Sequence, residues 1–156
     1  MKTGLVAVLL LLAPVPGFPH RLDEYLQATM LSIGKDRLEG QITLTSGVAV
    51  FPLLASDIDT DRDGTLSESE QRAYAERVLR DLWFTIDGRP LAPRLISMRF
   101  PAIAEMRDGV GGIQIEFQAD LPAGGPKRRL VFENRHQSRI GAYLVNCLVP
   151  SDPGTK

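Results

Sequence analysis

Residues 59–70 read Asp-Thr-Asp-Arg-Asp-Gly-Thr-Leu-Ser-Glu-Ser-Glu, and this stretch decides how the middle of the chain folds. Carboxylates occupy its first, third, fifth and twelfth positions, and Gly64 lies at its centre. Glycine accepts the left-handed backbone that a sharp bend requires. Alternating positions of a tight loop can direct their side chains toward one point. The stretch therefore predicts a loop that gathers oxygen atoms.

The spacing of these oxygens matches the EF-hand loop at every diagnostic position. Calcium is a hard cation that takes about six to eight oxygen ligands, and the repulsion among four nearby carboxylates favours a bound dication. The absence of nitrogen and sulfur ligands in the loop argues against zinc or copper. We therefore predict one Ca²⁺ site. Its ligands are the side chains of Asp59, Asp61 and Asp63, the Thr65 carbonyl, Ser67 directly or through water, and Glu70 with both oxygens.

The segments on both sides of the loop have helical spacing. In residues 48–58, apolar side chains recur at Val48, Phe51, Leu54 and Ile58, which predicts a short entering helix. In residues 67–81, Ser67 is the predicted N-cap, and Glu70 three residues later completes a capping box. The sequence thus predicts a helix-loop-helix insertion at about 48–82.

The rest of the chain has the pattern of short strands separated by turn residues. The expected strands are residues 22–33, 38–44, 83–86, 95–100, 113–119, 129–132 and 143–149, with turns at 34–36 and 87–88. The predicted fold class is α+β, mainly β: one antiparallel β-sandwich-like domain over residues 18–150, followed by a flexible tail at 151–156. Cys147, the single cysteine, lies in the last strand, where we expect a buried, inert thiol.

The first 17 residues have the pattern of a secretory signal peptide, with Lys2 ahead of the apolar run Leu5–Ala13 and cleavage expected after Gly17. The run is shorter than the roughly 20 residues that span a bilayer, so we expect export to the periplasm or secretion without stable membrane insertion. Without Lys2 the chain has 17 basic and 19 acidic side chains, a net charge of −2, which gives no indication of nucleic-acid binding.

Catalytic motifs are absent from the sequence: it has no nucleophile elbow, no phosphate-binding loop and no histidine-carboxylate metal motif. Two histidines also give little material for acid–base catalysis. We therefore predict a non-enzymatic protein.

Three stretches carry a family resemblance: His20-Arg-Leu-Asp-Glu-Tyr-Leu-Gln-Ala28, the loop at 59–70, and Glu133-Asn-Arg-His136 together with Tyr143-Leu-Val-Asn146. With them the chain resembles exported bacterial EF-hand domain-containing proteins of uncharacterised function. Some proteins of that type are similar to the extracytoplasmic part of membrane proteins of the HupE/UreJ family. The resemblance implies an exported calcium-binding protein.

Three hypotheses about function remain open at this stage. The first is a calcium-stabilised binding or accessory module with an unidentified protein partner. The second is a metal-trafficking accessory domain in which His20 and His136 bind a transition metal, with His136 otherwise expected as an ordinary surface histidine. The third is a truncated remnant of a larger, transporter-like membrane protein. A single loop and four methionines argue against a calcium-sensor switch.

Overall fold

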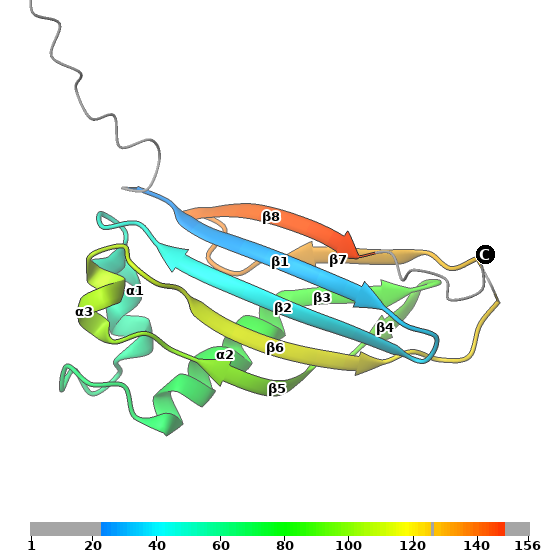
Figure 1. The fold of residues 1–156 in the computed structure, drawn as a ribbon, viewed down its shortest axis with the longest axis horizontal. Helices are drawn as coiled ribbons and strands as arrows, with labels where there is room; N and C mark the ends of the chain where they lie inside the picture. The colour runs from blue at the N-terminus through cyan, green and yellow to red at the C-terminus, as the bar shows by residue number, and fades with distance from the viewer. Residues whose placement is uncertain (1–22, 126, 149–156) are drawn as a thin grey trace, which may run out of the picture.

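A computed structural model describes residues 23–125 and 127–148, and in these ranges the protein has two layers. One layer is a five-stranded sheet in the order β5-β6-β2-β1-β8, and the other holds a three-stranded sheet in the order β4-β3-β7 together with α2 (Figure 1). The strands are β1 Tyr25–Ile33, β2 Arg37–Ser46, β3 Leu82–Ile86, β4 Arg89–Leu91, β5 Arg94–Arg99, β6 Ile113–Asp120, β7 Leu130–Asn134 and β8 Gly141–Leu148. The helices are α1 Phe51–Ile58, α2 Glu68–Asp81 and α3 Ile103–Arg107.

This architecture confirms the predicted α+β, mainly β class with two facing sheets. The predicted leader at 1–17 and the tail at 151–156 lie outside the described residues. Among the described residues, no helix has the length and apolar character needed to cross a membrane.

The core lies between the two layers. Side chains alternate along β1, β2 and β6, so that every second one faces inward, as on Tyr25 and Leu31. From the other layer, Tyr74 and Val78 of α2 and Phe84 of β3 are buried against them. Burial of apolar side chains stabilises the native state by about 25 cal/mol per Å².

Two predicted turns form as the sequence indicates. β1 and β2 pair as an antiparallel hairpin, which closes where the Gly34 N–H donates to the Arg37 carbonyl at 2.8 Å. β3 and β4 are joined at Asp87 and Gly88, which both have positive φ, as the two central residues of a type I′ turn do.

The arrangement of β8 differs from the antiparallel prediction, because β8 runs parallel to β1. After β7 the chain leaves the three-stranded sheet, and residues 135–140, which we call the β7–β8 turn, bring it to the five-stranded sheet beside β1. The other pairs in both sheets are antiparallel. A strand that arrives from another sheet is not bound by the antiparallel direction of a hairpin.

The position of β8 also explains why the prediction for Cys147 was wrong: the thiol is exposed. β8 is the last strand of its sheet, and most of its side chains are exposed on both faces. A strand-like apolar pattern predicts burial only for strands that the second layer covers. The sequence also missed two short elements, β4 and α3, and placed the start of α1 three residues early.

One close approach inside the core depends on the lack of a side chain. Gly40 of β2 lies opposite Phe117 of β6, and a Cβ on Gly40 would overlap the Phe117 ring. The ring therefore fills the place of the missing side chain.

Candidate metal centre

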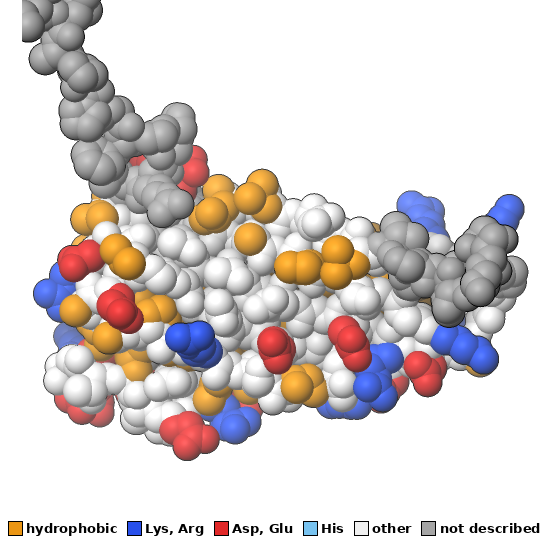
Figure 2. Space-filling view, viewed as in Figure 1, with side chains coloured by type: hydrophobic (Ala, Val, Ile, Leu, Met, Phe, Trp, Pro, Cys, Tyr) orange, Lys and Arg blue, Asp and Glu red, His pale blue; other side chains and the backbone are white. Residues whose placement is uncertain are grey.

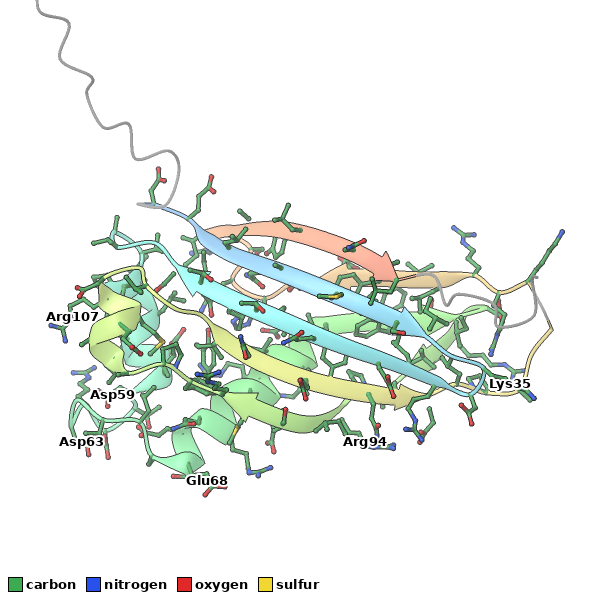
Figure 3. All side chains as sticks on the ribbon, viewed as in Figure 1. Lys35, Asp59, Asp63, Glu68, Arg94 and Arg107 are labelled. Carbon is green, nitrogen blue, oxygen red and sulfur yellow. The ribbon has the colours of Figure 1, made fainter. Side chains whose placement is uncertain are left out.

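The predicted calcium loop connects α1 to α2 at one end of the molecule. Figure 3 shows Asp59 and Asp63 on this loop, with Glu68 farther along at the start of α2. The Asp59 N–H donates to the Ala55 carbonyl at 2.8 Å, so the loop leaves directly from the last turn of α1. Gly64 has a φ of 83°, the left-handed conformation expected at the centre of the loop.

Three of the predicted ligands come together. Asp59, Asp61 and Asp63 each place one carboxylate oxygen within 4.8 Å of the others. Loop amides hold them in place: the Gly64 N–H donates to Asp59 Oδ2 at 3.1 Å, and the Asp63 N–H donates to Asp61 Oδ1 at 3.2 Å. These hydrogen bonds leave several carboxylate oxygens for a cation.

One oxygen of Asp59 tests whether the loop fits a metal ion. Asp59 Oδ1 is buried and has no hydrogen-bond partner among the described residues. A buried polar atom without a partner raises the free energy of the native state, and more so when it belongs to a charged group. A hard cation supplies the missing interaction, and oxygen is the ligand that calcium prefers. The residues present therefore fit calcium.

Glu70, at the twelfth position, does not belong to the cluster in which the three aspartate oxygens lie within 4.8 Å of one another, although its Oε1 accepts a hydrogen bond from the Asp61 N–H at 3.4 Å. Its Oε1 accepts hydrogen bonds from the Thr60 N–H at 2.7 Å and the Thr60 hydroxyl at 2.9 Å. Its Oε2 accepts from the Ser67 N–H at 3.0 Å and the Ser67 hydroxyl at 2.8 Å. These donors lower the pKa of Glu70 to about 2, so the carboxylate is ionised at neutral pH. In this conformation Glu70 ties the beginning of the loop to its end.

The side chains of the remaining predicted ligands, Thr65 and Ser67, form hydrogen bonds within the segment 59–70. The Thr65 hydroxyl donates to Asp63 Oδ1 at 2.7 Å. The Ser67 hydroxyl accepts from the Glu70 N–H at 3.3 Å, which confirms the predicted capping box at the start of α2. Sequence reasoning missed Thr60, because the EF-hand pattern places no constraint on that position of the loop.

His136, the second metal-binding candidate, is buried with only 1% of its surface exposed, so the expectation of a surface histidine was wrong. Its Nδ1 lies 2.7 Å from Asp81 Oδ2, and its Nε2 lies 3.1 Å from the Tyr74 hydroxyl. Both ring nitrogens are therefore engaged, and a metal would have to displace one of these partners. His20 lies outside the described residues.

His136 belongs to a polar network that joins the two layers. Its carbonyl accepts from Gln27 Nε2 of β1 and from the Tyr143 hydroxyl of β8, each at 2.8 Å. Its neighbour Gln137 donates to Asp57 Oδ2 of α1 at 2.9 Å. The β7–β8 turn thus contacts both helices that flank the calcium loop, as well as two strands of the large sheet.

Comparisons of the chain with protein-family models, curated proteins and solved structures find no match.

Proposed function

We propose that this protein binds one calcium ion through residues 59–70 and acts as an exported, non-enzymatic binding or accessory module. The observation that carries the proposal is the buried Asp59 Oδ1, which lacks a hydrogen-bond partner in the described part of the chain and belongs to a residue whose carboxylate converges with those of Asp61 and Asp63.

The proposed ligands are the six that the sequence indicates. Asp59, Asp61 and Asp63 supply carboxylate oxygens, Thr65 its carbonyl, Ser67 a hydroxyl or a bridging water, and Glu70 its carboxylate. For Glu70 to join them, its oxygens exchange hydrogen bonds from Thr60 and Ser67 for the cation. Because carboxylate ligands act in their ionised form, we expect calcium affinity to fall in acid.

A structural role follows from the position of the loop between two packed helices. Leu54 and Ile58 of α1 and Tyr74 of α2 are buried in the core. A cation at the loop lowers the repulsion among the carboxylates and fixes the ends of both helices. Binding to the native state alone raises stability when calcium exceeds the dissociation constant, which for extracellular modules is about 10⁻⁴ to 10⁻³ M.

Calorimetric titration with calcium tests the proposal. We expect saturable binding of one ion by the unaltered chain and loss of binding in Asp59→Asn. The matched control is Glu68→Gln, because Glu68 is a neighbouring carboxylate whose side chain is 85% exposed and lies outside the predicted ligand set. Absence of binding up to millimolar calcium, or equal loss in both variants, would contradict the proposal.

Export is a separate part of the proposal, and its support is the leader pattern of residues 1–17. The resemblance to exported bacterial EF-hand proteins also favours export. Intact-mass measurement of the protein recovered from the periplasm or the medium of a bacterial host tests it. We expect the mass of a chain that begins at Phe18, whereas a full-length protein retained in the cytoplasm would contradict export.

A further inference from the structure

The two sheets end in four edge strands, and three of these have features that discourage pairing with another strand. β5 has a register shift between Leu95 and Ser97 and is charged at both ends. β4 has three residues, one of them Pro90. β7 has Glu133, which pairs with Arg135 at 2.7 Å. Bulges, prolines, charges and short length are the usual protections of an exposed edge.

β8 lacks these protections. Its eight residues, Gly-Ala-Tyr-Leu-Val-Asn-Cys-Leu, include no charged residue and no proline. It pairs with β1 in an unbroken register from Gly141 to Leu148, and within the described residues β1 is its one partner strand. In the part of the chain that the structure describes, its other edge is unpaired, and an unpaired strand edge presents a row of backbone donors and acceptors.

Exposed apolar side chains also gather at this edge. In the described part, six of the eleven exposed large hydrophobic residues lie on β1 or β8, and Figure 2 shows orange side chains over these two strands. The six are Leu26, Met30, Tyr143, Leu144, Val145 and Leu148. Concentrated apolar exposure of this kind marks interaction surfaces in natural proteins.

We propose that a second copy of this chain pairs antiparallel with the open edge of β8, so that two five-stranded sheets become one sheet of ten strands. The lack of charge on β8 and on the neighbouring face of β1 favours a second copy of the chain over a charged peptide as the strand that pairs here. β8 is uncharged along its whole length, and the residues of β1 that share its outer face, from Leu26 to Ser32, are uncharged too. An identical strand brings neither repulsion nor an unpaired charge, whereas a charged peptide finds no counter-ion on these strands.

Symmetry limits the register of such a pair, and centring the pairing on β8 leaves two choices. A two-fold axis perpendicular to the sheet keeps inner faces beside inner faces, so each residue lies opposite one of the same parity. Near the middle of β8 the axis passes either Leu144 or Val145. With the axis at Val145, two valines meet, and Tyr143 lies opposite Cys147 of the partner subunit.

The proposed contact is confined to one eight-residue strand from each copy, whereas stable interfaces bury roughly 1,200 to 2,000 Å². Backbone hydrogen bonds supply the attraction, as in other cases of strand addition. We therefore expect a reversible dimer whose population rises with protein concentration.

Sedimentation velocity over a concentration series tests the proposal, with chelator present so that the result is independent of calcium binding. We expect Val145→Lys to weaken dimerisation at least about tenfold, because both registers place the two lysines near the axis and on the same face of the sheet. The matched control is Ile96→Lys on the opposite edge strand β5, since Val145 and Ile96 are both 51% exposed. A chain that stays monomeric at every concentration, or equal weakening by both variants, would overturn the proposal.

Disulfide trapping gives a second test that does not depend on weakening the dimer. In a Cys147→Ser background, we expect either Leu144→Cys or Val145→Cys to form an intermolecular disulfide under mild oxidation, whichever lies on the axis. The control is Ile96→Cys in the same background, which should stay monomeric. A dimer that neither β8 cysteine can trap would show that another surface forms the interface.

Discussion

Glu70 combines two roles in one carboxylate, as the twelfth residue of the proposed calcium loop and as the partner of the N-cap Ser67. In the described conformation its oxygens accept hydrogen bonds from Thr60, Asp61 and Ser67. The loop is therefore held closed by a side chain that a cation would recruit. Under the proposed calcium binding, this exchange of partners would set part of the affinity, because the hydrogen bonds lost oppose the ligand bonds gained.

Glu70 should make the metal-free protein sensitive to acid. Its native pKa of about 2 lies below its ordinary value of 4.5, so the stability that it contributes is present above pH 4.5 and is lost as pH falls toward 2. Urea unfolding of the metal-free chain should show this decline, and Glu70→Gln should flatten it. The same decline in Glu70→Gln as in the unaltered chain would contradict this role, and Glu68→Gln is the control.

Gly40 should be intolerant of even a methyl group. A Cβ at this position would overlap the Phe117 ring, and overpacking of a core costs about 1 to 3 kcal/mol. We expect Gly40→Ala to lower the free energy of unfolding by that amount in urea titrations. Gly125→Ala is the control, because a Cβ there meets no atom within 4 Å. Equal effects of the two substitutions would refute the packing argument.

Individual residues differ in how well the sequence predicts them, and the reason is the distance of their partners along the chain. The bonds of Glu70 reach residues at most ten positions away, and the capping box predicts those with Ser67. His136 is buried by Tyr74 and Asp81, which are 62 and 55 positions away. Local sequence patterns do not reveal partners at such distances, so the prediction from sequence placed His136 on the surface.

At the scale of elements, α2 is the helix that its own sequence specifies best. Ser67→Ala should therefore cost about 1 kcal/mol of stability in chelator, the usual value of a lost N-cap. Ser69→Ala is the control: Ser69 is exposed, and its hydroxyl contacts that of Ser67 at 3.0 Å, so we expect a change within about 0.5 kcal/mol. Chemical denaturation measures both variants, and an unchanged Ser67→Ala would contradict the cap.

The β7–β8 turn should give the protein a second pH dependence at higher pH. Burial lowers the pKa of His136 below its ordinary 6.5, although the nearby carboxylates of Asp81 and Asp57 act in the opposite direction and Arg77 adds to the lowering. The unfolded chain then binds the proton more readily, so stability is full above pH 6.5 and falls as pH drops below it. His136→Gln should remove this part of the dependence in urea unfolding. A dependence that is the same in His136→Gln as in the unaltered chain would assign it to another group.

Short elements explain most of what the sequence missed at this scale. β4 has three residues and α3 has five, too few for a periodic pattern to appear. The longer strands and α2 agree with the predictions to within a few residues. The predicted direction of β8 was wrong for another reason. The pattern of residues along a strand does not indicate which sheet the strand joins, and so it does not indicate the direction of its neighbours.

At the scale of the whole molecule, hydrogen bonds lead from the calcium loop to the edge of the large sheet. Gln137 donates to Asp57 of α1. The His136 ring is hydrogen-bonded to Asp81 of α2, and the His136 carbonyl accepts from the Tyr143 hydroxyl of β8. The helices at both ends of the loop are thus tied to the turn that begins β8.

This connection predicts that calcium stabilises more than the loop. Hydrogen exchange should show slower exchange in calcium for amides of residues 135–148 as well as 59–70, because local opening of the turn would disturb both helices. Glu70→Gln should abolish both effects, and Gln137→Ala should weaken the effect at the turn alone. Protection confined to residues 59–70 would show that the loop acts locally.

The parallel pairing of β1 with β8 has a consequence for the order of folding. β1 is among the first described residues to be synthesised, yet its second neighbour in the sheet is the last described strand. The β1–β2 hairpin can form early, but one side of β1 stays open until residues 141–148 have emerged, and such distant contacts form slowly. A chain whose synthesis stopped before residue 141 would keep that side of β1 exposed. The five-stranded sheet can therefore be completed only after β8 has been synthesised.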